Sequence, residues 1–232
     1  MITQKDIADF RRVLKRLRAA QADDVLRIAA AYEAGELSES RTQSGIVLTH
    51  SRYAGAVGKT TRDFLVSGHD GKDLSTPPIS DAASRGKAAR AANFYLSTVA
   101  ERSGAAERLL TDLDNLAYIA QRRFTASMAR KNRVKWKRDA SPDACEFCRM
   151  TALNEYSFND ADQAGAEYHD HCECVAVLAD DYETPPHVEE WAEQYEEARA
   201  NAKEAYGTVS PDAVLAAWRA GIGRGGSLPT GD

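Results

Sequence analysis

The sequence predicts a mainly α-helical protein in which a small α+β module follows a helical body and precedes an acidic C-terminal helix. Two observations predict this class. Apolar residues recur every three or four positions over most of the first 130 residues, which is the period of an amphipathic helix. From about position 139 to 181 this period is lost, and short polar stretches with clustered cysteine and histidine replace it.

Residues 1–34 are predicted to form the first helix. Their apolar side chains recur at helical spacing, and we expect Thr3 to cap this helix together with Asp6, three residues later. A solvated face is the main interpretation of the opposite side, and membrane or nucleic-acid binding is the alternative. That side is basic and carries Arg11, Arg12, Lys15, Arg16 and Arg18.

Two further helical stretches complete the body. Residues 38–66 are predicted as a helix that three glycines interrupt, and residues 67–81, with two glycines and two prolines, as a loop. Residues 81–130 give the strongest helical pattern, with breaks only at Gly86 and Gly104. The helical body is therefore expected to span positions 1 to 130.

Two histidines lie inside this body. His50 and His69 have no obvious partner nearby in the sequence. We expect them to be surface or loop histidines rather than functional ones.

The remaining chain is predicted as two segments, a module over residues 131–182 and a helical tail over residues 183–232. After two consecutive prolines the tail has one apolar edge, and Ser210-Pro211 are expected to begin a final short helix. The other face of the first tail helix is acidic, with Glu189, Glu190, Glu193, Glu196 and Glu197.

Composition excludes several classes of protein. Of the 232 residues, 43% are apolar and 28% charged, which is typical of a soluble chain long enough to bury a core. No stretch approaches 18 consecutive apolar residues, so we expect no membrane span, and the charged N-terminus predicts no secretory signal. Four cysteines are too few for a disulfide scaffold.

Charge is divided unevenly along the chain. Residues 1–138 hold 25 lysines and arginines against 15 aspartates and glutamates, whereas residues 139–206 hold 3 against 18. The steepest change lies at Arg138-Asp139. This division predicts two regions that face different surroundings, although a solvated acidic helix accounts for part of it.

All four cysteines lie between positions 145 and 174, in the order Cys145-x-x-Cys148 and then His169-x-x-Cys172-x-Cys174. A C-x-x-C turn directs two thiolates at one ion, and a second short cluster can complete a tetrahedron, which is the geometry that Zn²⁺ prefers. The site uses either the four cysteines, or three cysteines with His169. A site filled in this way is structural, because no position remains for a reacting water.

Other interpretations of the cysteines are weaker. A thioredoxin-type redox pair would need a βαβ setting, which the sequence does not indicate. Four unrelated buried thiols would rarely fall within so short a part of the chain.

A basic run precedes the first cysteine pair. Residues 122–138 hold eight lysines and arginines and no acidic residue, and Phe124 and Trp136 are interleaved with them. Such a run is typical of nucleic-acid contact, and pairing with the acidic tail helix is an equal alternative. The candidate contact residues are Arg130, Lys131, Arg133, Lys135, Lys137 and Arg138.

These residues resemble a known family, the MuF-type head-morphogenesis proteins, which are minor capsid proteins of tailed bacteriophages. The family's pattern is a lead-in rich in tryptophan or arginine, a C-x-x-C pair, and H-x-x-C-x-C about twenty residues later. The version found here is similar to that of phages infecting actinobacteria. The resemblance rests on Val134-Lys135-Trp136-Lys137, Asp143-Ala144-Cys145-Glu146-Phe147-Cys148 and Tyr168-His169-Asp170-His171-Cys172-Glu173-Cys174.

The resemblance covers residues 133–178, about a fifth of the chain, and the helical body agrees with it only in character. Asp170 stands where many members have proline, so the turn before Cys172 is expected to be less rigid. Glu173 stands where arginine is common, so any anion-binding role of that position is expected to be lost.

What the resemblance implies is an assembly protein and not an enzyme. It implies a treble-clef-like, zinc-stabilised knuckle over residues 131–182, whose metal ligands come from Cys145, Cys148, His169, Cys172 and Cys174. It further implies association with phage portal and capsid proteins or with packaged DNA, and a location in the phage head interior or at the portal vertex, after assembly in the host cytoplasm. Neither a membrane nor a small-molecule substrate is expected.

Two other functions fit part of the pattern. A zinc-containing nuclease of the H-N-H kind can be framed by such cysteine pairs, but it needs further histidines after the cluster, where only His187 follows. A zinc-ribbon DNA-binding protein would need a basic recognition helix near the metal, whereas the helix predicted after the cluster is acidic and would be repelled by phosphate.

Overall fold

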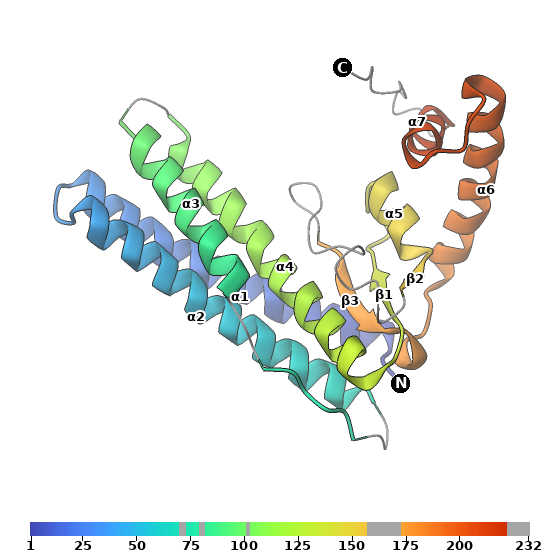
Figure 1. Cartoon of the computed structure of the whole chain (residues 1–232), viewed down its shortest axis with the longest axis horizontal. Coiled ribbons are helices and arrows are strands. Elements are labelled where there is room, and N and C mark those ends of the chain that lie inside the picture. Colours follow the sequence, from blue (N-terminus) through green and yellow to red (C-terminus); the bar gives the residue numbers. More distant parts are fainter. Residues whose placement is uncertain (70–72, 79–81, 101–102, 157–172, 222–232) are drawn as a thin grey trace. The chain divides into compact units, whose positions relative to one another are not determined.

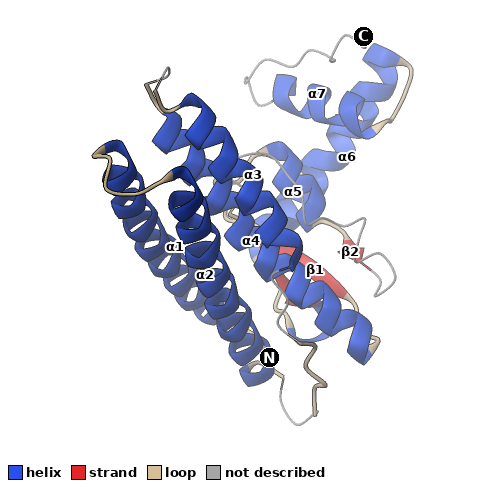
Figure 2. Ribbon diagram, turned by 60° about the vertical axis from the view of Figure 1, so that its left-hand side comes forward, coloured by secondary structure: helices blue, strands red, loops and turns tan. Residues whose placement is uncertain are grey.

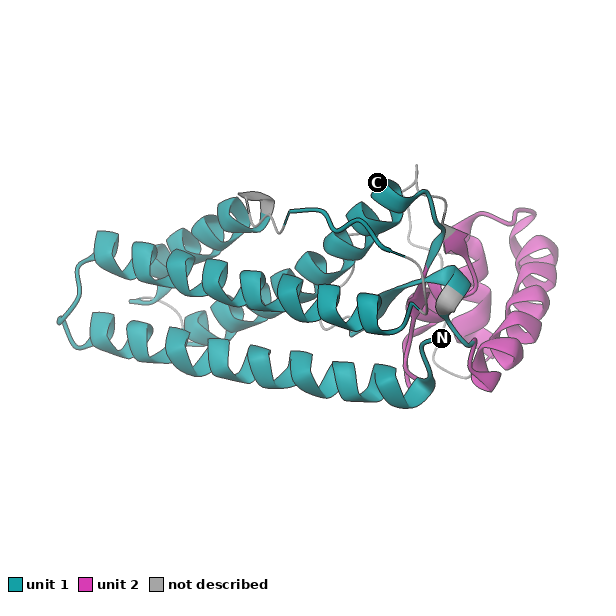
Figure 3. Ribbon diagram, turned by 90° about the horizontal axis from the view of Figure 1, so that it is seen from below, with its two compact units in different colours: residues 1–136, 156–183 teal, residues 137–155, 184–232 magenta. Residues whose placement is uncertain are grey.

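The computed structural model describes residues 1–69, 73–78, 82–100, 103–156 and 173–221. The chain divides into two compact units, coloured separately in Figure 3. The first unit comprises Met1–Trp136 and Tyr156–Glu183, and the second comprises Lys137–Glu155 and Thr184–Asp232. These units are defined by contacts between residues. The three consecutive segments expected from the sequence, residues 1–130, 131–182 and 183–232, stay a prediction.

The first unit is built on four helices that run in alternating directions (Figure 1). These are α1 (Gln4–Glu33), α2 (Glu39–Ser67), α3 (Ala82–Thr98) and α4 (Ala105–Asn132). Each helix packs along its neighbour, α1 on α2, α2 on α3, and α4 on both α2 and α3. The prediction of a mainly helical protein is therefore confirmed.

The start of α1 follows from its sequence. The Thr3 side chain accepts a hydrogen bond from the Asp6 N–H at 3.3 Å, and the Asp6 carboxylate accepts one from the Thr3 N–H at 3.0 Å. These bonds satisfy backbone donors that have no partner within the helix. The Thr3 hydroxyl also donates to the Asp6 carboxylate at 2.6 Å, and this bond, together with that from the Thr3 N–H, lowers the pKa of Asp6 because it stabilises the charged form. The predicted cap is confirmed.

The helices α1 and α2 approach each other closely. The rings of Phe10 and Phe64 stack at 4.1 Å between centroids. At Gly45, an added Cβ would lie 3.3 Å from Cδ1 of Ile28, so the absence of a side chain lets the helices meet. The three glycines that weakened the prediction lie inside one continuous helix, because this packing outweighs their low helix propensity.

Both isolated histidines are buried; the expected surface or loop position is wrong for His50, which lies within α2, whereas His69 does lie in the loop after α2. His50 lies on the inner face of α2, one turn from Ile46 on one side and Tyr53 on the other, and all three are buried. Its Nδ1 lies 3.3 Å from the Gln21 side-chain amide of α1. His69, just after α2, is 5% exposed. The burial of both histidines depends on the tertiary packing, which their neighbours in the sequence do not determine.

The long predicted stretch over residues 81–130 consists of two helices. Gly104 has a φ of +90° in front of α4, a left-handed conformation that glycine adopts without a steric penalty. Gly86 does not interrupt α3. The predicted apolar face of α4 is buried at Leu109, Leu113 and Leu116.

Within the described residues, three short strands form one sheet in the order β2-β1-β3, shown in red in Figure 2. They are β1 (Trp136–Asp139), β2 (Glu155–Tyr156) and β3 (Val175–Leu178). All four residues of β3 are buried, and β3 packs on α4. A short 3₁₀ turn, η1 (Ala179–Asp181), leads from β3 to Tyr182, which forms a parallel bridge with Ile2. Within the first unit, the N-terminal residues thus pair with the segment after β3.

The second unit contains α5 (Glu146–Ala152), α6 (Pro186–Tyr206) and α7 (Pro211–Gly221). These three helices pack on one another. As predicted, Trp191 on the apolar edge of α6 is buried, and Ser210 caps α7 through a bond from the Ala213 N–H at 3.4 Å. The predicted glutamate face is exposed and comprises Glu189, Glu190, Glu193, Glu196 and Glu197.

Among the described residues, every helix is too short or too polar to cross a membrane.

Candidate metal centre

The first cysteine pair lies at the start of α5. Cys145 is the residue before the helix, in an extended conformation, and its carbonyl accepts the Arg149 N–H at 2.9 Å. Cys148 follows within the first turn and is 3% exposed. Side chains three residues apart at a helix start lie on the same face. This local geometry fits two thiolate ligands of one ion.

The turn that presents Cys145 is held by Arg149. Its Nε donates to the Ala144 carbonyl at 2.8 Å and its Nη2 to the Pro142 carbonyl at 3.4 Å. The guanidinium also lies 5.3 Å from the ring centre of Trp191, within the range of a cation–π contact. The loop in front of α5 is therefore fixed by contacts within the second unit.

The last cysteine, Cys174, directly precedes β3 and is 3% exposed. The buried Arg122 of α4 donates from Nη1 to the Cys174 carbonyl at 3.1 Å. The preceding residue on the same helix is Gln121, whose side chain donates to the Ala176 carbonyl and accepts from the Ala176 N–H, both at 2.9 Å. Two neighbouring polar residues of α4 thus hold the backbone of residues 174–176.

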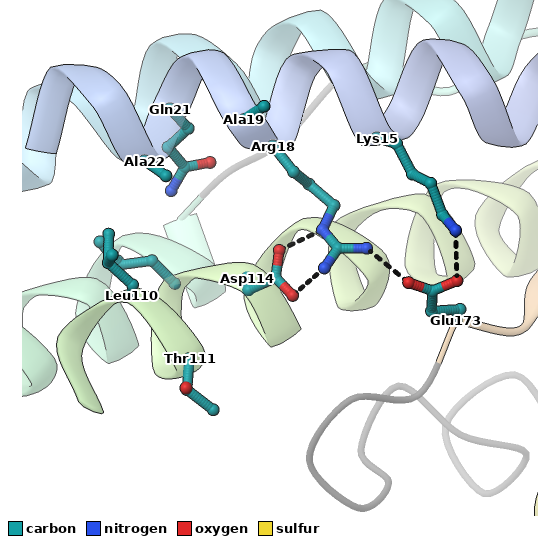
Figure 4. A pocket seen from close by; sticks show the side chains of 10 residues that line it. Lys15, Arg18, Ala19, Gln21, Ala22, Leu110, Thr111, Asp114 and Glu173 are labelled. Atoms are coloured by element: carbon teal, nitrogen blue, oxygen red, sulfur yellow. Dashed lines mark hydrogen bonds and ion pairs between the residues drawn. The ribbon is translucent and has the colours of Figure 1, made fainter. Parts of the chain in front are cut away.

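Glu173 is fixed from a second side, as Figure 4 shows. One of its oxygens lies 3.0 Å from Nζ of Lys15, and the other 3.3 Å from Nη1 of Arg18. Arg18 also pairs with both carboxylate oxygens of Asp114 and donates to the hydroxyl of Tyr118 at 2.8 Å. The segment before β3 is therefore tied to α1 as well as to α4.

These charges line a pocket of about 430 Å³ between α1 and α4, with Glu173 at its edge (Figure 4). Burial opposes the charged form of Arg18, but its bonds to Asp114 and Tyr118 outweigh this and raise its pKa above the ordinary value. Burial likewise raises the pKa of Tyr118 to about 12. Arg18 is therefore a fixed positive charge with two carboxylate partners, and it stabilises the packing of α1 on α4.

The five predicted ligands are placed only in part. Cys145 and Cys148 belong to the second unit and Cys174 to the first. His169 and Cys172 lie outside the described residues. Within the described part of the chain, no three histidine, cysteine or acidic side chains are gathered in a way that could hold a metal ion. The zinc site thus stays a prediction, supported locally by the geometry of the α5 pair.

The basic run is partly exposed. Arg130, Lys131, Arg133 and Lys135 are exposed at the end of α4 and just after it. Arg130 and Lys131 lie in the last turn, where positive side chains favour the negative end of the helix dipole. The Lys131 ammonium also donates to the Thr76 carbonyl at 2.8 Å. Part of this positive charge therefore stabilises the helix end itself.

The other two candidate contact residues are buried. Lys137 is 8% exposed and Arg138 is fully buried, because both lie on β1, whose four residues are all buried. The Lys137 ammonium lies 3.2 Å from the hydroxyl of Thr184. The sequence grouped all six residues into one contact surface, whereas only four of them are exposed.

Two residues that hold the backbone of residues 174–176, Gln121 and Arg122, were not predicted from the sequence to do so. Arg122 was grouped with the basic run, and Gln121 was not singled out. A signal for Gln121 was present, because the row of every fourth residue Leu109, Leu113, Ala117 continues through Gln121 and Thr125. Polar residues that continue a buried row need buried partners, and here the partner is the backbone of β3.

Comparison with known proteins gives one family. A family model described as VG15 protein matches residues 1–198. No curated protein and no solved structure matches the chain.

Proposed function

Because the chain belongs to the VG15 protein family, which is phage-associated, we propose that it is a minor capsid protein of a tailed bacteriophage. In this role it acts in head morphogenesis as a structural component and not as an enzyme. The family match supports a phage origin, and the resemblance of the cysteine and histidine motif to MuF-type proteins supports the finer assignment. The match reaches residue 198 and so includes the whole motif.

The observation that supports the structural role is the way in which the last two residues of the motif, Glu173 and Cys174, are held by the helices of the first unit. Gln121, Arg122 and Arg18 all bind the segment that contains Glu173 and Cys174. Side chains that bind backbone carbonyls and a neighbouring carboxylate fix a position, which is what a structural metal site requires. These contacts support a structural and not a catalytic role for this end of the motif.

Zinc is the metal that this donor set fits best. Cys145, Cys148 and Cys172 are the proposed thiolate ligands, and either His169 or Cys174 completes the set. When bound, a four-coordinate zinc ion of this kind links chain segments and supplies folding free energy.

The proposed partner of the exposed basic residues is an acidic surface of the portal protein. Arg130, Lys131, Arg133 and Lys135 form a compact set of positive charges at the end of α4. Packaged DNA is also negatively charged and is present at high local concentration. It is therefore the alternative partner that an experiment must distinguish from the portal protein. Contact with either partner would weaken with salt.

The direct experiment is quantitative mass spectrometry of heads purified from the phage that encodes the chain. We expect the protein in assembled heads, in few copies beside the portal, and we expect heads from a deletion mutant to be defective. Recovery of the protein only from the soluble lysate, with normal heads in the deletion mutant, would contradict the proposal. A plasmid-cleavage assay with Mg²⁺ or Mn²⁺ separates it from a metal-dependent nuclease, for which we expect no activity.

A further inference from the structure

The pocket of about 430 Å³ between α1 and α4 contains a hydrogen-bond acceptor that no described residue uses. Gln21 of α1 is 4% exposed, and its one hydrogen bond within the described ranges runs from its Nε2 to Nδ1 of His50 at 3.3 Å. Its Oε1 therefore receives no donor from them. In Figure 4 this side chain points from α1 into the pocket, toward Leu110 on α4. A buried carbonyl oxygen of this kind favours a ligand that donates a hydrogen bond.

Two carboxylates line the same pocket and keep unused acceptor positions. Asp114 pairs through both of its oxygens with Arg18. The two oxygens of Glu173 lie 3.0 Å from Nζ of Lys15 and 3.3 Å from Nη1 of Arg18. A carboxylate has about four lone-pair positions, so these bonds saturate neither group. Glu173 already binds an ammonium and a guanidinium at once, and Asp114 has room for an ammonium beside Arg18 in the same way.

The remaining walls of the pocket are largely apolar. They are formed by Ala19, Ala22, Leu110 and Leu113. Such walls accommodate the methylene groups of an alkyl chain while its charged head reaches the polar atoms. An anion fits less well, because the positive charges of Lys15 and Arg18 are already paired with carboxylates and the Gln21 oxygen would repel it.

We propose that this pocket binds a primary ammonium group on a short alkyl chain. The ammonium donates to Oε1 of Gln21 and to the carboxylate of Asp114, and the alkyl chain lies against the four apolar side chains. A lysine side chain of another protein and a free alkyl diamine both carry this group. The site lies within the first unit and needs no metal, so it stands or falls independently of the cysteine motif.

The test is an NMR titration of the isotope-labelled full chain with n-butylamine, which is protonated at neutral pH. We expect the side-chain amide signal of Gln21 to shift with a dissociation constant of about 1 mM, a strength within reach of so small a ligand. The neutral n-butanol and the anionic butanoate have the same length and should each bind about 10-fold more weakly or worse. Equal or tighter binding of either would overturn the proposal, and so would the absence of any shift at Gln21 with the amine.

Two variants verify the position of the site. Ala22→Leu fills the apolar part of the pocket and removes no hydrogen bond, whereas Gln21→Met removes the acceptor at similar size. Each should weaken butylamine binding by about 10-fold. Ala8→Leu, exposed on α1, and Gln43→Met, whose amide bonds to Asn93 on the surface, are the matched controls and should bind as the wild type does. Helical circular dichroism verifies folding, and wild-type affinity in either folded test variant would overturn the proposal.

Two further probes separate the sources of the ammonium. Nα-acetyl-lysine amide presents a lysine side chain as a protein does, and putrescine is a free alkyl diamine. Tighter binding of the lysine derivative would assign the site to a partner protein, and tighter binding of putrescine would assign it to a free diamine. Binding of neither would overturn the proposal, because both carry the proposed group.

Discussion

Gln121 and Ala176 exchange two hydrogen bonds, in which the side-chain amide of α4 takes the place of a neighbouring strand. Its Nε2 donates to the Ala176 carbonyl and its Oε1 accepts from the Ala176 N–H, both at 2.9 Å and both buried. Thr125, one turn further along α4, lies 3.4 Å from the same carbonyl. The helix therefore satisfies the backbone of β3 and fixes its register against the bundle.

The first prediction concerns the stability that this pair provides. Gln121→Met keeps the size of the side chain but leaves the buried Ala176 N–H without its acceptor. We expect the free energy of unfolding to fall by about 2 to 3 kcal/mol, measured by urea denaturation. Gln43→Met, whose amide bonds to Asn93 on the surface, is the control and should change stability by less than about 0.5 kcal/mol. Equal losses in the two variants would contradict the prediction.

The second prediction concerns alkaline pH. Burial raises the pKa of Tyr118 to about 12, whereas the unfolded chain deprotonates this residue near pH 10. The unfolded state therefore binds fewer protons in this range, and the stabilising contribution is complete below pH 10 and is lost as the pH rises through 12. We expect the stability difference between the wild type and Tyr118→Phe to shrink by about 2 to 3 kcal/mol over that interval. A difference that stays constant from pH 9 to 12 would show that Tyr118 does not titrate in this way.

The third prediction concerns the metal. Elemental analysis of the purified chain should give one zinc per molecule, and Cys145→Ser or Cys148→Ser should lose it. Each variant should become sensitive to protease over residues 140–180 and keep most of its helical signal, because the bundle helices α1–α4 do not contain these cysteines. Met150→Leu on the same helix is the control. If the metal-free wild type resists protease equally over that stretch, zinc has no structural role there.

The fourth prediction concerns the exposed basic residues. Replacing Arg130, Lys131, Arg133 and Lys135 by glutamine should abolish co-purification with the portal protein at low salt. If DNA is the partner instead, four phosphate contacts would make the wild-type affinity fall about 100-fold between 50 and 200 mM salt, and the variant should flatten that slope. A control with the same change in charge replaces Arg27, Arg41, Arg90 and Lys203, all exposed elsewhere. An equal effect of both sets would show that net charge, and not this surface, determines binding.

The helical part of the fold could be predicted from the sequence because its signals are local. The apolar period, the Thr3–Asp6 cap and the Ser210-Pro211 start all act within a few residues of the chain, and the structure confirms each of them. The helix over residues 38–66 was predicted nearly to its ends despite its glycines.

The positions of buried polar groups could not be predicted in the same way. Arg122 and Arg138 look alike in a basic run, and burial of both follows from strands that pack beside them and not from their neighbours in sequence. His50 is similar, since only the approach of Gln21 from α1 gives it a buried partner. For the candidate site, the cysteine pair on α5 could be predicted from the sequence, whereas the contact of Arg122 with the Cys174 backbone follows only from the packing of α4 on β3.

The bridge between Ile2 and Tyr182 has a consequence for the order in which the protein forms during synthesis. About 180 residues separate the two. A ribosome that adds 5 to 20 residues per second takes roughly 10 to 35 seconds to synthesise the chain between them. During that time the four long helices can emerge and pair, but Ile2 has no partner strand, and the Glu183 N–H that later donates to its carbonyl has not yet been made. The N-terminal end of the bundle is thus completed only after the segment that contains all four cysteines, residues 145–174, has left the ribosome.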